Sequence, residues 1–344
     1  MSKANKKKLR VAINGFGRIG RATLKAALIK NADFDVVAIN DLTEPSTLAH
    51  LFKYDSCYGE YEAEVVAKNG YLHVGSKKFK VMAERDPLVL PWKEIEVDVV
   101  IESTGIFRNK EAAMKHIKAG AKKVILSAPG KGGGIKTIVL GVNEGKIKKN
   151  DKVISNASCT TNCLSPVTQV IKDNFGIKKA IMTTIHSYTA DQRIVDAPHK
   201  DLRRARAAAV NIVPTTTGAA KATCETIPSL KGKFDGMAVR VPTPVASLVD
   251  VTYVTRKKVD EKKVNAAFKK ASQSARLKGI LAVTNEPLVS SDYIGDPAST
   301  IVDTELTKVI DGDLLKVVAW YDNEWGYSNR LVDMVEYLGK KRLV

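Results

Sequence analysis

The sequence predicts an α/β protein built from two domains, and three observations carry this prediction. The chain has 344 residues, and at roughly 150 residues per domain each half is long enough to bury a core of its own. The first half alternates short β-branched runs with amphipathic helical stretches, which is typical of a parallel sheet with crossover helices. After residue 160 long extended runs dominate, and these favour a mixed or antiparallel sheet.

The elements can be placed in order along the chain. In the first half, β-branched runs predict strands at 9–14, 35–40, 97–103 and 123–129, and the first strand leads into a helix at 18–30. In the second half, extended runs lie at 178–188, 236–255 and 314–322. Near the end, apolar residues at helical spacing predict an amphipathic helix over 329–341 that packs on a domain surface; they are Leu331, Met334, Val335 and Leu338.

The net charge of +18 indicates anionic partners, which include nucleic acid, anionic lipid and small phosphorylated substrates or cofactors. Part of the excess lies in segments typical of a solvated surface, among them Lys3, Lys6, Lys7 and Lys8 at the start. No nucleic-acid-binding module is recognisable, and an aromatic content of 6% does not favour a platform for stacking bases. We therefore expect no dedicated nucleic-acid partner, and we expect any binding of RNA as a side activity to weaken as salt rises.

The composition also bears on location and metal content. No apolar run approaches the ~20 residues of a membrane span, and the start of the chain lacks the apolar stretch of a secretory signal. Four cysteines are too few for a disulfide scaffold in a chain of this size, and none forms a C-x-x-C zinc motif. We therefore expect a cytoplasmic protein with no membrane partner and no metal site.

A dinucleotide site is predicted at the end of the first strand. The strand runs directly into GFGRIG, which places Gly15, Gly17 and Gly20 in G-x-G-x-x-G spacing before a helix. The first glycine permits the tight turn, the second lets a pyrophosphate approach the backbone, and the third lets the helix pack close to the strand. Asp41 follows the next strand, 21 residues beyond Gly20, where a carboxylate binds ribose hydroxyls and repels a 2′-phosphate. The pattern favours NAD over NADP.

Cys159 is the candidate nucleophile. An extended run ends near residue 158 and a helical pattern follows, closed by Gly176, so Ser158 is expected to cap the helix. Cys159 would lie in the first turn, where unpaired N–H groups and the helix dipole lower the pKa of a thiol from its usual value of about 8.5. Cys163, one turn deeper, is expected to be a buried structural thiol. Pro166 predicts a kink or a short first segment.

A thiol nucleophile needs a base, and His186 is the best candidate among five histidines. It lies where an extended run ends in a polar loop, and such strand ends present side chains to clefts. On its position alone, a structural role for His186 remains the alternative.

From about residue 9 to residue 340 the sequence closely resembles the phosphorylating glyceraldehyde-3-phosphate dehydrogenases. The resemblance rests on several long motifs in the family's order: INGFGRIGR (13–21), SNASCTTNCL (155–164), TIHSYT (184–189), DLRRARAA (201–208), PTTTGAAK (214–221), RVPTP (240–244) and WYDNEWGYSNR (320–330).

The resemblance implies an NAD-dependent oxidation of D-glyceraldehyde 3-phosphate to 1,3-bisphosphoglycerate. Cys159 would attack the aldehyde carbon to form a hemithioacetal, His186 would activate the sulfur, and inorganic phosphate would attack the resulting thioester. Two anion sites are implied, since oxyanions need charge-assisted hydrogen bonds. The substrate phosphate would bind near Thr189 and Arg240. The attacking phosphate would bind near four residues: Ser158, Thr160, Thr217 and Gly218.

The same resemblance implies further cofactor contacts. Arg18 and Ile19 would lie at the pyrophosphate turn, Arg85 and Ser127 along the groove, and Asn323 beside the nicotinamide amide. A solvated surface position is the alternative for Arg85, which stands in the segment ERDP.

Domain boundaries and assembly follow from these assignments. We expect an NAD-binding domain of the Rossmann type over residues 1–158, completed by a C-terminal helix over 323–344, and an α+β catalytic domain on a mostly antiparallel sheet over 159–322. The family's members are usually homotetramers, in which the loop over roughly 187–212 reaches a neighbouring subunit's cofactor. A solvated basic face is the alternative for that loop.

Some positions depart from the family's patterns. Ala197-Pro198 stands where NAD-specific relatives often carry Leu-Pro and NADP-using relatives often carry Ala-Ser, so some use of NADP remains open. Oxidation of erythrose 4-phosphate by the same cysteine, histidine and cofactor groove is the alternative function.

Overall fold

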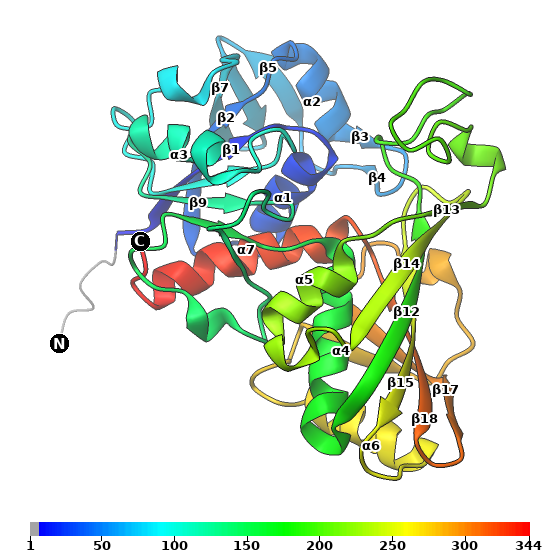
Figure 1. Cartoon of the computed structure of the whole chain (residues 1–344). Coiled ribbons are helices and arrows are strands. Elements are labelled where there is room, and N and C mark those ends of the chain that lie inside the picture. The colour runs from blue at the N-terminus through cyan, green and yellow to red at the C-terminus, as the bar shows by residue number, and fades with distance from the viewer. Residues whose placement is uncertain (1–6) are drawn as a thin grey trace. The chain divides into compact units, whose positions relative to one another are not determined.

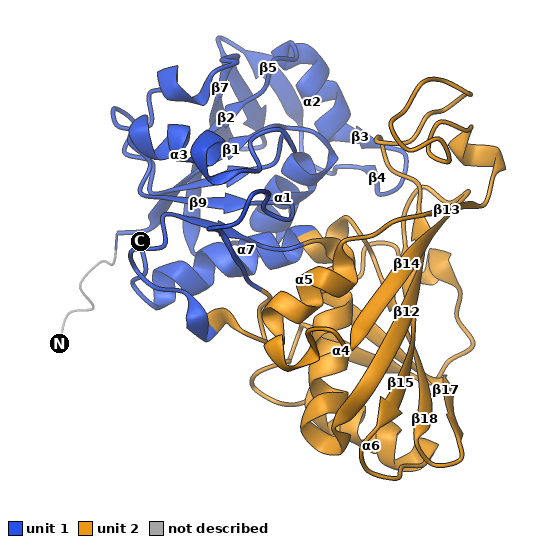
Figure 2. Cartoon of the chain, in the orientation of Figure 1, with its two compact units in different colours: residues 1–138, 145–157, 328–344 blue, residues 139–144, 158–327 orange. Residues whose placement is uncertain are grey.

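The structure is a computed structural model that describes residues 7–344, so Lys3 and Lys6 of the basic start lie outside the described residues. The chain divides into two compact units, coloured separately in Figure 2. Unit 1 comprises residues 1–138, 145–157 and 328–344, and unit 2 comprises residues 139–144 and 158–327.

Unit 1 is built on a nine-stranded sheet in the order β10-β11-β9-β8-β1-β2-β7-β6-β5. Pairing is parallel from β10 to β7, and β7, β6 and β5 pair antiparallel. The four strands predicted in this half are present as β1, β2, β8 and β9. The strands are β1 (Leu9–Asn14), β2 (Phe34–Asn40), β5 (Val65–Lys68), β6 (Tyr71–Val74), β7 (Lys77–Met82), β8 (Val99–Glu102), β9 (Lys123–Leu126), β10 (Lys136–Thr137) and β11 (Val153–Ser155).

Both faces of this sheet are covered. Successive residues of a strand point to opposite faces, and Ala12 and Ile13 of β1 belong to two different apolar clusters. The Ala12 cluster includes Ala113 of α3, and the Ile13 cluster includes Leu24 of α1 and Phe52 of α2. The central strands β8 and β9 are buried at every position and mostly apolar, as expected where both faces of a sheet are covered. The helices are α1 (Arg18–Ile29), α2 (Pro45–Lys53) and α3 (Lys110–Lys118); α2 leads into a small hairpin of β3 (Tyr54–Asp55) and β4 (Gly59–Glu60).

The predicted C-terminal helix is confirmed as α7 (Trp325–Lys340), drawn in red in Figure 1. All four of its predicted apolar residues are fully buried. Polar contacts tie it to the end of α1, because Asp333 accepts a hydrogen bond from Lys30 (2.6 Å) and Glu336 accepts one from the backbone N–H of Asp33 (3.1 Å).

Unit 2 is built on a seven-stranded, mostly antiparallel sheet in the order β13-β14-β12-β15-β18-β17-β16. Only the pairs β12–β14 and β16–β17 are parallel. The extended run over 236–255 forms two strands, because the chain turns through Ala246 at a φ of 68°. The strands are β12 (Ile177–Ser187), β13 (Val213–Thr215), β14 (Phe234–Val241), β15 (Ser247–Thr255), β16 (Leu281–Thr284), β17 (Thr300–Ile310) and β18 (Leu314–Tyr321).

Three helices cover one face of this sheet (Figure 1): α4 (Cys159–Phe175), α5 (Ala219–Thr226) and α6 (Glu261–Ser272). The core beneath them includes Leu164 and Val167 of α4, Phe268 of α6, and Val251 and Val317 of the sheet. β15 alternates between buried and partly buried residues along its length, as expected for a strand with one covered face. The segment between β12 and β13 contains only one short 3-10 helix, Ala208–Val210.

Candidate active site

Cys159 is the first residue of α4, as the sequence predicts. Ser158 caps the helix, and its hydroxyl oxygen accepts a hydrogen bond from the backbone N–H of Thr161 at 3.1 Å. α4 continues without a break through Pro166 and ends at Gly176, whose φ of 68° suits a glycine. The predicted short first segment is therefore wrong. Cys163 is fully buried in the core, whereas Cys159 is partly exposed.

His186 meets Cys159 in space. It lies near the end of β12, and its Nε2 is 3.4 Å from Sγ of Cys159. On the other side of the ring, Nδ1 is 2.7 Å from the carbonyl oxygen of Ser187. Nδ1 faces both this acceptor and a donor, Nη1 of Arg240, at 2.9 Å. We assign the proton to Nδ1, because Nη1 already donates to the same Ser187 carbonyl at 2.8 Å; the lone pair of Nε2 then faces the thiol.

Burial decides the protonation state of this pair. Burial, reinforced by the charge of Arg240, lowers the pKa of His186 to about 3, so its imidazole is neutral at physiological pH. Burial also raises the pKa of Cys159 above its ordinary value, and the charge of Arg240 opposes this only in part. The sequence predicts the opposite direction for the thiol, and that prediction is wrong, because the loss of water around the sulfur outweighs the helix terminus.

Arg240 lies beside His186 because β12 and β14 pair in parallel with these two residues opposite each other. Its Nη1 donates to the carbonyl oxygen of Ser187 at 2.8 Å and lies 2.9 Å from Nδ1 of His186. Its Nε is buried and has no hydrogen-bond partner within the described residues. A buried donor without a partner is costly, and a bound oxyanion would satisfy it.

A chain of hydroxyl groups begins beside the cysteine, where Oγ1 of Thr160 lies 4.0 Å from Sγ. The Tyr321 hydroxyl lies 2.9 Å from Oγ1 of Thr160 and 2.9 Å from Oγ1 of Thr184. Burial raises the pKa of Tyr321 well above its ordinary value, so the phenol stays protonated and can donate. Thr160, predicted at the attacking phosphate, is therefore held by Tyr321 next to Cys159.

Three other predicted phosphate residues lie on loops of unit 2. Thr189 follows β12, and Thr217 and Gly218 precede α5, where Oγ1 of Thr217 accepts a hydrogen bond from the N–H of Ala219 at 3.2 Å. Within the described residues, none of the three forms a hydrogen bond with Cys159, His186 or Arg240.

Arg204 is a site residue that the sequence analysis did not single out. Its positive charge contributes to lowering the pKa values of both His186 and Arg240. It is oriented by hydrogen bonds from Nε to Oγ1 of Thr215 (3.0 Å) and from Nη2 to the carbonyl oxygen of Thr216 (3.1 Å). The motif DLRRARAA contains it, but the sequence offers several arginines there and no means to choose among them.

The glycine turn of unit 1 has the geometry of a phosphate cradle. Gly15 has a φ of +90°, and a Cβ on it would lie 2.6 Å from the backbone nitrogen of Thr104. A Cβ on Gly20 would collide with the carbonyl oxygen of Gly15, whereas one on Gly17 would meet nothing within 4 Å. The turn therefore packs tightly on its protein side and leaves open space at Gly17, which fits a pyrophosphate at the start of α1.

Asp41 lies directly after β2, beside this turn. Its Oδ2 accepts a hydrogen bond from the N–H of Phe16 at 2.7 Å, and its Oδ1 accepts one from the N–H of Thr43 at 2.9 Å. Each carboxylate oxygen keeps capacity for a further donor, so the residue fits the binding of a ribose hydroxyl.

The other predicted cofactor residues make fewer contacts with the glycine turn or make none. Ile19 lies in the first turn of α1, and Arg18 forms an ion pair with Asp55 at 3.3 Å. Arg85 is exposed and makes no hydrogen bond or ion pair within the described residues, whereas Ser127 follows β9. Asn323 belongs to unit 2, where its Oδ1 accepts a hydrogen bond from the hydroxyl of Ser247 at 3.0 Å.

Metal-ligand clusters and membrane-spanning helices are absent from residues 7–344. No group of three or more His, Cys, Asp or Glu side chains in this range could hold a metal ion. None of the helices in the same range is long and apolar enough to cross a membrane.

Comparisons with known proteins agree on one family. The model of the glyceraldehyde 3-phosphate dehydrogenase NAD binding domain matches residues 9–110, and that of the C-terminal domain matches residues 158–323. Similar proteins include glyceraldehyde-3-phosphate dehydrogenases of Streptomyces coelicolor (56% identity) and Geobacillus stearothermophilus (58%), each aligned over 97% of this chain and 99% of its own length. The chloroplastic enzyme A of Chlamydomonas reinhardtii is 54% identical over 97% of this chain and 90% of its own length. The chain therefore belongs to the glyceraldehyde 3-phosphate dehydrogenase family.

Proposed function

We propose that the protein oxidises D-glyceraldehyde 3-phosphate with NAD and inorganic phosphate and releases 1,3-bisphosphoglycerate. The observation that carries this proposal is the 3.4 Å approach of Cys159 Sγ to Nε2 of a neutral His186, with Arg240 on the other side of the imidazole. Thiol, base and guanidinium are the groups required by an aldehyde oxidation that proceeds through a covalent thioester to a phosphorylated product.

The first half of the reaction uses the Cys159–His186 pair. Sγ forms a bond to the aldehyde carbon, and the thiol proton passes to Nε2 of His186 and then to the carbonyl oxygen, which gives a hemithioacetal. Nε2 then accepts the hydroxyl proton as the thioester forms. The nearby charge of Arg240 disfavours the imidazolium, so His186 readily returns the proton to sulfur when the C–S bond breaks.

NAD, when bound, supplies the acceptor for the hydride that leaves the substrate carbon. We assign its pyrophosphate to the Gly15–Gly20 turn with Arg18 and Ile19, its adenosine ribose to Asp41, and its nicotinamide amide to Asn323. Arg85 and Ser127 complete the groove in this proposal. The carboxylate of Asp41 supports NAD over NADP because it repels a 2′-phosphate, while Ala197-Pro198 leaves room for some use of NADP.

The second half needs a phosphate that attacks the thioester carbon. An oxygen of inorganic phosphate bonds to that carbon, the C–S bond breaks, sulfur regains the proton from His186, and the phosphate's own proton goes to solvent. Ser158, Thr160, Thr217 and Gly218 are the proposed ligands of this phosphate, and Thr189 and Arg240 those of the substrate phosphate. The unpartnered Nε of Arg240 supports anion binding here. The nearby charge of Arg204 is already paired with the carboxylates of Asp191 and Asp201.

We also propose a cytoplasmic homotetramer. The segment between β12 and β13 carries five apolar side chains that are at least 70% exposed, namely Ile194, Val195, Leu202, Val210 and Ile212. Apolar exposure on this scale is typical of an interface, which supports burial of the segment between subunits. The mechanism needs a free thiol at Cys159, which supports a reducing compartment.

The test follows the appearance of NADH after glyceraldehyde 3-phosphate and NAD are added to the purified protein, with and without inorganic phosphate. Sustained turnover only with phosphate is the expected result. Turnover indifferent to phosphate would contradict the acyl-phosphate step, and turnover only with erythrose 4-phosphate would show that the substrate is misassigned.

A further inference from the structure

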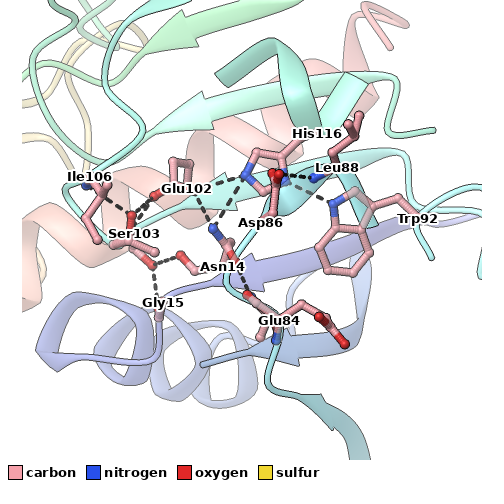
Figure 3. Close-up of polar contacts among 12 residues, drawn as sticks. Asn14, Gly15, Glu84, Asp86, Leu88, Trp92, Glu102, Ser103, Ile106 and His116 are labelled. Atoms are coloured by element: carbon pink, nitrogen blue, oxygen red, sulfur yellow. Dashed lines mark hydrogen bonds and ion pairs between the residues drawn. The ribbon is translucent and has the colours of Figure 1, made fainter. Parts of the chain in front are cut away.

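A second group of buried polar side chains lies in unit 1, outside the residues that the reaction uses (Figure 3). His116 of α3 is 0% exposed and Glu102 at the end of β8 is 2% exposed. Nε2 of His116 and Oε2 of Glu102 are 3.0 Å apart, and Nδ1 of His116 is 3.0 Å from Nε1 of Trp92. Buried titratable groups are costly unless every polar atom is paired. The hydrogen-bond partners of these side chains therefore determine how the cluster is arranged.

The indole of Trp92 fixes the tautomer of His116. Indole N–H can only donate, so Nδ1 of His116 must accept and the ring proton must lie on Nε2. That proton is donated to Glu102, whose Oε2 also accepts from Nδ2 of Asn14 at 2.6 Å. Oε1 of Glu102 accepts from both the backbone N–H and the hydroxyl of Thr104. Four donors therefore bond one buried carboxyl group.

One branch of the network leads to the glycine turn. Glu102 holds Thr104, and the backbone nitrogen of Thr104 is the atom that would lie 2.6 Å from a Cβ on Gly15. Ser103 stands between Glu102 and Thr104 in the chain, and its hydroxyl lies 2.6 Å from the carbonyl oxygen of Gly15 and 3.1 Å from that of Asn14. The backbone against which Gly15 packs is thus set by the Glu102 carboxylate.

A second branch leads to the segment around Asp41 and Arg85. Oδ1 of Asn14 accepts from Nδ2 of Asn40 at 2.7 Å. Asn40 in turn bonds both backbone groups of Glu84, donating to its oxygen and accepting from its nitrogen, each at 2.8 Å. Asn40 directly precedes Asp41, and Glu84 directly precedes Arg85.

We propose that Glu102 and His116 are positioning residues for NAD, which set the glycine turn and the Asp41 segment through Asn14, Ser103 and Thr104. They do not touch the cofactor themselves. The inference rests on the proposed cofactor site in unit 1, and its physical basis is that a backbone held in its binding geometry before the ligand arrives loses less entropy on binding.

The test compares His116→Leu with His116→Gln. Leu fills space but bonds neither Trp92 nor Glu102, whereas the Gln amide offers an oxygen to the indole and an N–H to the carboxylate. We expect the Leu variant to bind NAD about tenfold more weakly and the Gln variant to recover to within about twofold of wild type. Calorimetry on the cofactor-free protein measures binding. The Michaelis constant for NAD should rise with the dissociation constant, while that for the aldehyde should not.

A second readout needs no cofactor. Amide hydrogen exchange over residues 13–20 should be faster in the Leu variant than in wild type, because the turn has lost its support. Val74→Ala serves as the control: Val74 is buried in the β6 strand of the same unit and takes no part in the network. It should lower stability without changing NAD affinity.

The outcomes are separable. Equal NAD affinity in the folded Leu variant and wild type, or equal loss in the Leu and Gln variants, would overturn the proposal. If the wild type itself does not bind NAD, the proposed function fails, and the exchange of residues 13–20 still decides whether the network holds the turn. Should the Leu variant not fold, Trp92→Phe removes the indole donor and keeps an aromatic ring, and unchanged NAD affinity and unchanged exchange of residues 13–20 in that variant would also overturn the proposal.

Discussion

Alkylation of Cys159 by iodoacetamide should proceed at a constant rate between about pH 4 and about pH 6, and His186→Gln should make the rate climb with pH. Sγ of Cys159 lies 3.4 Å from Nε2 of His186. The two groups together hold one proton between the pKa of His186, about 3, and the raised pKa of the thiol. Transfer of that proton from Sγ to Nε2 leaves a thiolate 3.4 Å from an imidazolium, and their attraction, about 5 kcal/mol at an effective dielectric constant of about 20, offsets much of the low pKa of His186. Up to about pH 6 this pair supplies more thiolate than loss of the proton to solvent does, so the share of reactive thiolate is independent of pH there.

The Gln variant removes the internal acceptor. Thiolate then forms only by loss of the proton to solvent, and with an ordinary pKa of about 8.5 its fraction is about 3% at pH 7 and about 0.3% at pH 6. Burial raises the thiol pKa further, so these fractions are upper limits. The alkylation rate should rise about tenfold for each pH unit.

Mass spectrometry of the peptide that contains Cys159, in protein without cofactor, measures this rate. Cys224 is an internal control: burial raises its pKa, and its sulfur lies near the carbonyl oxygens of Leu230 and Phe234, so its alkylation should follow the tenfold slope in both proteins. A wild-type slope at Cys159 equal to that of Cys224 would refute proton sharing with His186. A flat slope in the Gln variant would place the base elsewhere.

Three further predictions concern single side chains. Cys159→Ser should abolish NADH formation while NAD binding by calorimetry stays intact, because the alcohol is hardly ionised at neutral pH; near-normal turnover would exclude Cys159 as nucleophile. Asp41→Ala should raise the ratio of kcat/KM for NADP to that for NAD, and an unchanged ratio would mean that the ribose is held elsewhere. Tyr321→Phe removes the hydroxyl that lies 2.9 Å from both Thr160 and Thr184, so the unfolding free energy by denaturant titration should fall by about 1–3 kcal/mol; an unchanged value would mean that water replaces these bonds without cost.

The sequence predicts much of the fold because the relevant signals are local. β1 occupies the predicted residues 9–14, and the helical spacing near the end predicts the buried face of α7. The G-x-G-x-x-G spacing predicts the tight turn at Gly15, since only glycine adopts its backbone conformation without strain. The antiparallel extension β5–β7 has no comparable signal, because its strands are short, with four residues in β5, four in β6 and six in β7.

At the active site the sequence by itself determines the residue types and the cap that begins α4. Tertiary structure decides how they act. Parallel pairing of β12 with β14 brings His186 beside Arg240. The sequence of neither strand indicates which strand pairs with it. Burial, a sum over neighbours far apart in the chain, raises the pKa of Cys159 where the helix terminus alone would lower it. Local sequence therefore determines which groups are present and how the backbone turns around them, and packing determines which groups meet and where each proton resides.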